Sequence, residues 1–368
     1  MYESTVLDRL EEVRKIDKSN ILGYCVKTNI YCEDAVQRAK QVSIKYGRPK
    51  HIVLVGMGGS AIGGEILRDW LLDKVPVPIE VCRDYNLPAY ANEDTLVFAI
   101  SCSGKTEETL SAFVDAVKRG CKIITITSGE HLLSFSEKLG VPYVIVPSEL
   151  PSRVTLPYLF LPLPIFLEKL GVLQNCEKEI QEMIRIVKKL CQENSLEIPA
   201  KENPSKKLAL ELKGTIPVVY GFRQYSAIAR RLKTQFNENS KVPSRYDVFP
   251  ELNHNEVVGW EASESLTKRF SVLLIRDREE PREIKNRIEA TRSLILHKAQ
   301  KVLEVYARGE SKLARMFSVL FVGDLASVYL AILRNTDPTP VEIISKMKEE
   351  MGKRFNVMER LKREVLSR

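Results

Sequence analysis

The sequence predicts an α/β protein with two doubly wound domains, each a parallel sheet flanked by helices. Three observations support this prediction. Short apolar, β-branched runs alternate with helix-length segments in the first half of the chain. A similar alternation resumes after a long helical stretch. The length of 368 residues is long for one domain and ordinary for two.

The first domain is assigned to residues 1–150. Its strands are predicted from five short apolar runs, at residues 51–56, 79–83, 95–101, 122–127 and 143–146. These runs lack polar alternation, as is typical of strands buried on both faces. Helices are expected between them, over residues 60–72, 106–118 and 131–139. Strands joined by helical crossovers pair in parallel, so a doubly wound sheet is expected.

A helical connector is expected over residues 151–212, with a very apolar helix at 156–170 and an amphipathic one at 177–190. The second domain, residues 213–335, is predicted to be of the same kind as the first. Its expected strands are 216–220, 269–276 and 302–306, and its expected helices are 226–235, 284–297 and 313–334. The prolines of Asp337-Pro-Thr-Pro340 then break the chain. Residues 336–368 should form a C-terminal helix, from about 341 to 366, that packs back on the site.

The composition is that of an ordinary globular protein, with 44% hydrophobic and 28% charged residues. No run approaches the ~20 apolar residues of a membrane helix, so no membrane partner is expected. The N-terminus lacks the apolar core of a signal peptide, which predicts a cytoplasmic protein. The net charge of +8 suits an anionic small ligand. There is no basic arm or zinc-finger spacing, so nucleic acid is not expected as a partner.

The cysteines and histidines indicate neither a disulfide framework nor a metal site. Seven cysteines are present, an odd number, and none form a C-x-x-C pair. The four histidines are far apart in the sequence. Reduced thiols are therefore expected, and no metal ligands are assigned.

The first glycine-rich motif, GMGGSAIGG, occupies residues 56–64, between a predicted strand and a predicted helix. Glycines let a ligand approach the backbone, and a helix N-terminus offers free N–H groups and a positive dipole. Gly58, Gly59 and Ser60 are therefore candidate ligand-binding residues. The alternative is a tight turn in which Ser60 caps the helix, although five glycines exceed what such a turn needs.

The second motif, SCSGKTEETL, occupies residues 101–110 and also joins a strand to a helix. Ser101, Ser103 and Thr106 place three hydroxyls around a glycine at a helix N-terminus, which suits a phosphate monoester. The alternative is a capping box begun by Ser103.

The two motifs together are more specific than either one, because consecutive loops at the carboxyl ends of parallel strands converge on one crevice. A dinucleotide fold is the main competing interpretation. Gly56-x-Gly58-x-x-Ala61 fits the nicotinamide fingerprint, and Asp84 follows the second strand as a ribose-binding acid would. That fingerprint does not need a hydroxyl-rich loop after the next strand.

The order of motifs resembles the sugar isomerase (SIS) family, and most closely its bifunctional phosphoglucose/phosphomannose isomerases. Besides the two loops, the resemblance rests on Pro151-Ser-Arg153, Asn237-Glu-Asn-Ser-Lys241, Glu251-Leu-Asn-His-Asn-Glu256 and the C-terminal helix around Lys348. It implies two SIS-type domains that interconvert glucose 6-phosphate and mannose 6-phosphate with fructose 6-phosphate. The implied route is metal-independent proton transfer through a cis-enediol(ate), with no cofactor.

The resemblance also implies roles for single residues. Gly59 and Ser60 belong to the sugar-side loop, and Ser101, Ser103 and Thr106 belong to the phosphate loop. Where relatives commonly carry an aromatic residue and Asn, this chain has Cys102 and Lys105. These departures keep the hydroxyl pattern but leave the local electrostatics open.

Four further residues are given catalytic roles by the resemblance. Glu238 moves the proton between C1 and C2, and Arg153 steadies the enediolate charge. His254 and Lys348 open the sugar ring, with Lys346 as the alternative lysine. The chemistry agrees, because this reaction needs a carboxylate base, a cation at the oxyanion and an acid/base near neutral pKa.

Other interpretations stay open at the level of sequence. Glu238 would otherwise be a surface acid, His254 a loop hydrogen-bonding residue, and Arg153 a cap of the connector helix. A second function class is a non-catalytic SIS-fold sugar-phosphate sensor, but such sensors normally carry a DNA-binding segment, and none is found. An aminosugar-forming relative would need a glutaminase domain with an N-terminal Cys. The resemblance further implies a homodimer in which His254 serves the neighbouring subunit's site.

Overall fold

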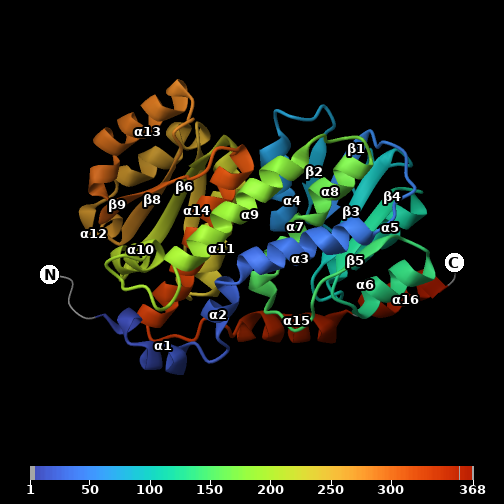
Figure 1. The fold of residues 1–368 in the computed structure, drawn as a ribbon, viewed down its shortest axis with the longest axis horizontal. Coiled ribbons are helices and arrows are strands. Elements are labelled where there is room, and N and C mark those ends of the chain that lie inside the picture. Colours follow the sequence, from blue (N-terminus) through green and yellow to red (C-terminus); the bar gives the residue numbers. More distant parts are fainter. Residues whose placement is uncertain (1–4, 356, 367–368) are drawn as a thin grey trace. The chain divides into compact units, whose positions relative to one another are not determined.

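A computed structural model describes residues 5–355 and 357–366. The chain folds into two units, each built from separate segments of the sequence. Unit 1 has its described residues at 5–29 and 178–340, and unit 2 at 30–177, 341–355 and 357–366. Our expected domain boundaries treated each domain as continuous, whereas both observed units are discontinuous. The α/β fold class with two parallel sheets flanked by helices is confirmed (Figure 1).

The sheet of unit 2 has five parallel strands in the order β2-β1-β3-β4-β5. They are β1 (His51–Val55), β2 (Ile79–Cys82), β3 (Thr95–Ser101), β4 (Lys122–Thr127) and β5 (Tyr143–Ile145). Each differs from its predicted run by at most one residue. The central strand β3 is buried along its whole length, as an apolar run covered on both faces should be.

The helices of unit 2 cover both faces of this sheet and include the C-terminal segment. They are most of α3 (Thr28–Gln41), then α4 (Gly59–Leu71), α5 (Glu107–Lys118), α6 (Glu130–Lys138), α7 (Leu156–Phe160), α8 (Pro162–Lys169), α15 (Glu342–Arg354) and α16 (Val357–Leu366). The single C-terminal helix that we expected is wrong, because α15 ends where the backbone of Phe355 turns extended, at φ −157° and ψ 127°.

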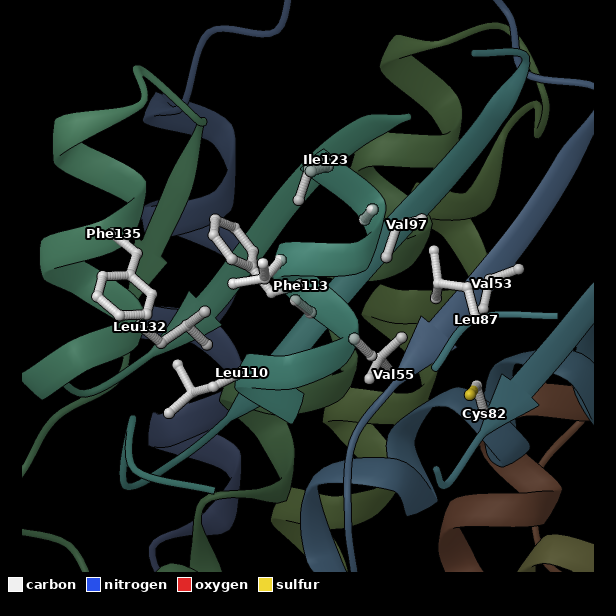
Figure 2. Close-up of a cluster of buried hydrophobic side chains, with 14 of the residues drawn as sticks. Val53, Val55, Cys82, Leu87, Val97, Leu110, Phe113, Ile123, Leu132 and Phe135 are labelled. Carbon is white, nitrogen blue, oxygen red and sulfur yellow. The ribbon is translucent and has the colours of Figure 1, made fainter. Parts of the chain in front are cut away.

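One cluster of buried side chains holds α5, α6 and α16 to a face of the unit 2 sheet. Figure 2 shows its main members, with Phe113 of α5 among side chains of the sheet and of α6. Val357 and Leu361 bring α16 into the same cluster. This packing fixes α5, and therefore its N-terminus, on the sheet.

The sheet of unit 1 has four parallel strands in the order β7-β6-β8-β9. They are β6 (Ile216–Phe222), β7 (Arg245–Phe249), β8 (Phe270–Arg276) and β9 (Lys301–Tyr306). The sequence analysis missed β7, whose residues RYDVF carry two charges. It is an edge strand, half-buried at most positions, so it does not need a continuous apolar run.

The helices of unit 1 come from both of its segments. They are α1 (Leu10–Ile16), α2 (Ile21–Cys25), most of α9 (Cys176–Glu193), α10 (Pro204–Leu212), α11 (Ser226–Glu238), α12 (Glu264–Thr267), α13 (Arg282–Leu294) and α14 (Lys312–Leu333). The α10 N-terminus has Pro204 at its first position and Asn203 as its cap, with the Asn203 side chain accepting from the Lys206 N–H at 2.9 Å.

The helix α14 corrects one expectation. It is long and apolar enough to cross a membrane by length and composition, although we expected no such stretch. Most of it is buried within unit 1, where it packs against α10 and α11. Its Asp324 pairs with Arg231 of α11, with Nη2 and Oδ2 2.6 Å apart. We therefore identify α14 as the core helix of unit 1.

Candidate active site

The loop between β1 and α4 leaves two glycines open to approach. Gly58 adopts φ +51°, which favours glycine, and stands at the N-cap position of α4. A Cβ at Gly58 or Gly59 would meet no atom within 4 Å, and both residues are exposed. The N-terminus of α4 is therefore accessible to a ligand, as expected for an anion site.

The other glycines of this motif serve packing rather than ligand access. A Cβ at Gly63 would come within 2.9 Å of the Leu159 carbonyl oxygen in α7. A Cβ at Gly64 would come within 2.9 Å of the Leu54 Cβ in β1. The excess of glycine that suggested a ligand loop is thus partly explained by close approach of α4 to its neighbours.

The loop between β3 and α5 gathers three hydroxyls. Ser101 Oγ and Thr106 Oγ1 are 2.9 Å apart and share a hydrogen bond, and Ser103 Oγ accepts from the Lys105 N–H at 3.3 Å. Thr106, not Ser103, stands at the N-cap of α5, and its side chain makes no capping bond there. The alternative of a Ser103 capping box is therefore wrong.

A direct hydrogen bond joins the two loops. The Cys102 N–H donates to Ser60 Oγ at 3.3 Å. Ser60 lies inside α4, whose N-cap is Gly58, so the interpretation of Ser60 as the cap is wrong. The strands β1 and β3 are paired neighbours, which brings the two loops to the same edge of the sheet.

Cys102 is held in place by two residues that the sequence analysis did not single out. Ser128 Oγ donates to the Cys102 carbonyl at 2.5 Å, and Thr155 Oγ1 lies 3.7 Å from Cys102 Sγ. Burial raises the pKa of the Cys102 thiol. The thiol is therefore neutral near pH 7, and Cys102 adds no negative charge beside the hydroxyls.

The charged groups around the second loop are partly neutralised. Lys105 Nζ lies 2.9 Å from Glu130 Oε1, and this pairing lowers the pKa of Glu130. Burial and the neighbouring Glu108 raise the pKa of Glu107, while Lys348 opposes this shift. The acidic groups near the N-terminus of α5 are thus accompanied by Lys105 and Lys348.

A pocket of about 360 Å³ lies between the N-terminus of α5 and α15. Thr106, Glu107 and Lys348 line it, together with apolar side chains of α15 that include Met347. Lys346, the alternative lysine, is not among the lining residues and lies 3.9 Å from Glu342 along the same helix. Lys348 is therefore the lysine that the structure brings to the hydroxyl loop.

Arg153 is also in unit 2, in the 3-10 helix Ser152–Val154. Its side chain is half-buried. Thr155, two residues later, contacts Cys102. This places Arg153 on a segment that is anchored to the hydroxyl loop.

Glu238 is in unit 1, as the last residue of α11, and is half-buried. The segment after it is held by side-chain bonds to α14. Asn239 Nδ2 donates to Ser327 Oγ at 2.8 Å, and Ser240 Oγ donates to the Ser327 carbonyl at 2.6 Å. Asn237 Oδ1 accepts from the Ser244 N–H at 2.9 Å. These bonds fix the position of the α11 C-terminus.

His254, also in unit 1, ends the 3-10 helix Glu251–His254 and is exposed. Its neighbours are anchored, since Asn253 Nδ2 donates to Thr291 Oγ1 at 2.7 Å. Asn255 Oδ1 accepts from the Glu256 N–H at 2.6 Å. A fixed backbone with an exposed imidazole suits proton exchange with a bound ligand.

The predicted site residues thus fall into one group in each unit. In unit 2 the structure brings together the first loop, the hydroxyl loop and Lys348, and it anchors the Arg153 segment nearby. Glu238 and His254 belong to unit 1. Within residues 5–355 and 357–366, no three His, Cys, Asp or Glu side chains are grouped as a metal site would need.

Comparison with known protein families identifies two matching segments. Residues 46–132 match the SIS domain, and residues 201–351 match the bacterial phospho-glucose isomerase C-terminal SIS domain. The first segment contains both loops, and the second contains Glu238, His254 and Lys348.

Several curated relatives match along most of the chain. One is the bifunctional phosphoglucose/phosphomannose isomerase of Caldicellulosiruptor bescii, 40% identical over 92% of this chain and 96% of that protein. Another is the D-glucosamine-6-phosphate 4-epimerase of Sulfolobus acidocaldarius, 30% identical over 81% of this chain and 88% of that protein. Among solved structures, a hypothetical protein from Thermus thermophilus has a similar fold. Its TM-score is 0.74 at 17% identity, over 95% of this chain and 96% of that chain.

Proposed function

Because the chain belongs to the family of bifunctional phosphoglucose/phosphomannose isomerases, we propose that it interconverts glucose 6-phosphate and mannose 6-phosphate with fructose 6-phosphate. The observation that carries this proposal is the joined pair of loops in unit 2. Ser60 is hydrogen-bonded to the Cys102 N–H, and Cys102 belongs to the loop that leads into α5. The same loop carries the hydroxyls of Ser101, Ser103 and Thr106. Neutral hydroxyl donors at a helix N-terminus suit a phosphate monoester.

The phosphate is proposed to bind at the N-terminus of α5. Ser103, which is exposed, and Thr106, which is half-buried, would donate hydrogen bonds to its oxygens. Ser101 is fully buried and would position Thr106 through their shared hydrogen bond, and Lys348 lines the same pocket. Glu107 lines that pocket beside Lys348, whose positive charge opposes the repulsion between Glu107 and the phosphate. Gly58 and Gly59 leave room for the sugar to approach the backbone.

Glu238 is proposed as the base. Its carboxylate takes the proton from C2 of the open-chain aldose, and the C–H electrons form the C1–C2 double bond of a cis-enediolate with its charge on O1. A proton then passes from O2 to O1, and Glu238 returns its proton to C1, which gives the ketose. Glucose and mannose 6-phosphates share this enediolate, so one base serves both if the C2–C3 bond turns between protonations.

The remaining residues are proposed to support this transfer. The Arg153 guanidinium stabilises the negative oxygen of the enediolate. His254 and Lys348 open the ring by moving a proton between the ring oxygen and the O1 hydroxyl. These side chains supply the whole proposed route, so no metal or cofactor takes part. We further propose a cytoplasmic homodimer, in keeping with the family resemblance and with seven free thiols.

A coupled assay on purified protein with EDTA present tests the proposal. We expect turnover of both glucose 6-phosphate and mannose 6-phosphate to fructose 6-phosphate. Conversion of glucose 6-phosphate alone would refute the bifunctional assignment, and conversion of neither would refute the isomerase and favour a sugar-phosphate sensor. Glucosamine 6-phosphate is the matched third substrate. Its epimerisation at C4 without aldose–ketose conversion would assign the chain to the other activity found among its relatives.

A further inference from the structure

A second pocket, in unit 1, has no part in the proposed reaction. It has a volume of about 370 Å³ and lies beside the amino ends of β7 and β8. We call it the Trp260 pocket, and its main lining residues are Val218, Arg245, Glu256, Trp260, Thr267 and Phe270. Its volume is in the range of small-molecule sites.

One wall of the Trp260 pocket is a fixed chain of polar groups. Trp260 Nε1 donates to Tyr220 Oη at 2.9 Å, and Tyr220 Oη donates to Glu256 Oε1 at 3.0 Å. Arg245 Nη2 donates to Glu256 Oε2 at 2.8 Å. Both carboxylate oxygens of Glu256 are therefore occupied, and this side chain is only 15% exposed. The guanidinium of Arg245 has five N–H donors and is 62% exposed, so it can still bind a ligand.

Thr267, which also lines the pocket, has a buried hydroxyl without a described partner. Thr267 is 3% exposed, and its Oγ1 makes no hydrogen bond with any protein group that the structure describes. Such a buried group costs stability unless something bonds to it. The walls around it are apolar, with the rings of Trp260 and Phe270 edge to face, 6.1 Å between centroids.

We propose that the Trp260 pocket binds a small carboxylate with a flat apolar body. Arg245 offers hydrogen-bond donors only, and the Thr267 hydroxyl can donate as well as accept, so both can bind a ligand that carries acceptor oxygens. A cationic ligand is disfavoured because Arg245 already pairs with the Glu256 carboxylate and places an exposed positive charge at the pocket. The aromatic walls suit a planar ring of the size of benzoate.

Ligand binding in the Trp260 pocket is also expected to change the environment of His254. Glu256 follows His254 by two residues, and the side chain of Asn255 between them is bonded to both sides. Asn255 Nδ2 donates to Glu251 Oε1 at 2.9 Å, and Asn255 Oδ1 accepts from the Glu256 N–H. A carboxylate that binds the Arg245 guanidinium therefore perturbs the segment that carries His254. The consequence for catalysis rests on the proposed role of His254, whereas the binding does not.

Benzoate titration of the purified protein tests the proposal by calorimetry and by the ¹H spectrum of its four histidines. We expect a dissociation constant of about 1 mM or tighter, unchanged by saturating fructose 6-phosphate. The His254 resonance, assigned with His254→Asn, should shift with the same midpoint. Arg245→Gln and Thr267→Val should each weaken binding about tenfold. Thr267→Val should leave the unfolding midpoint unchanged or higher, because it removes an unpartnered hydroxyl.

Arg269→Gln is the matched control. Arg269 is exposed and close in sequence to Thr267, but it does not line the pocket, so the change removes a positive charge without altering the pocket wall. It should bind benzoate as the wild type does. The proposal is overturned if benzoate does not bind at about 10 mM, if both pocket variants bind it normally, or if fructose 6-phosphate displaces it. If the His254 resonance does not shift when benzoate binds, the proposed effect of the pocket on His254 is overturned. None of these measurements depends on isomerase activity. The binding proposal can therefore fail while the proposed function holds, and the reverse.

Discussion

The backbone N–H of Cys102 donates a hydrogen bond to Ser60 Oγ, and this bond joins the loop after β3 to the helix that follows β1. Two motifs that lie 42 residues apart therefore form one surface. Ser128 and Thr155 also contact Cys102. The hydroxyl loop is thus fixed before any ligand binds, which lowers the entropy cost of binding.

The first prediction concerns the hydroxyls of this loop. Ser103→Ala and Thr106→Val should weaken the binding of every sugar 6-phosphate alike, by about tenfold to a hundredfold, because each removes a donor to a charged group. Calorimetric dissociation constants for glucose, mannose and fructose 6-phosphates measure this effect. Thr109→Val is the control, because Thr109 is buried in the same helix and its hydroxyl has no described partner. An effect on one epimer only would mean that the loop binds the sugar instead.

The second prediction separates two lysines of α15. Lys348 lines the pocket beside Thr106, whereas Lys346 does not. Lys348→Ala should lower kcat/KM for the ring-closed aldose phosphates by at least about 100-fold, as expected for an acid/base group. Lys346→Ala should stay near the wild-type value. The reverse pattern would assign ring opening to Lys346 and contradict the placement of Lys348 beside the hydroxyl loop.

The third prediction concerns the turn inside the hydroxyl loop. Gly104 has φ +67°, and a Cβ there would come within 1.9 Å of the Gly129 carbonyl oxygen. Gly104→Ala should lower the free energy of unfolding by about 1–2 kcal/mol from its backbone conformation and by about 1–3 kcal/mol more from overpacking. Gly140 has φ +65° with no atom within 4 Å of a Cβ, so Gly140→Ala reports the backbone effect alone. Equal losses in urea unfolding would show that the Gly129 contact is absent.

The fourth prediction tests the homodimer that the family resemblance implies. Glu238→Ala and His254→Ala chains, each inactive, are mixed under conditions of subunit exchange. If His254 acts in the neighbouring subunit, each mixed dimer holds one site with both residues. About half of the dimers are mixed at random pairing, so roughly a quarter of the wild-type activity should return. No activity in mass-verified mixed dimers would place His254 in the site of its own chain.

Much of the fold could be predicted from the sequence, because strands buried on both faces leave continuous apolar runs. The strands β1–β5 are of this kind, and their ends were predicted to within one residue. The strand β7 was not predicted, because an edge strand with exposed Arg245 carries no such run. The break at Phe355 also escaped prediction, since the surrounding residues continue a helical pattern. The assignment of residues 5–29 to unit 1 depends on tertiary contacts that no local pattern encodes.

The candidate site was predicted as a set of residues, but not as an arrangement. Glycine content alone cannot separate Gly58, which is open, from Gly63, which packs against Leu159 nearly a hundred residues later. The anchoring of Cys102 by Ser128 and Thr155 likewise depends on segments brought together by the sheet. The local pattern of hydroxyls did identify the loop itself.

The measurement that tests the central claim most directly is turnover by Glu238→Gln. This change keeps the size of the side chain and removes the base. We expect kcat for fructose 6-phosphate to fall by about 10⁴-fold or more, with its dissociation constant nearly unchanged. Glu264→Gln, an exposed acid of α12 outside the proposed site, is the control and should retain wild-type kcat. A loss of only a few-fold in Glu238→Gln would contradict the account, because Glu238 would then not carry the proton between C2 and C1.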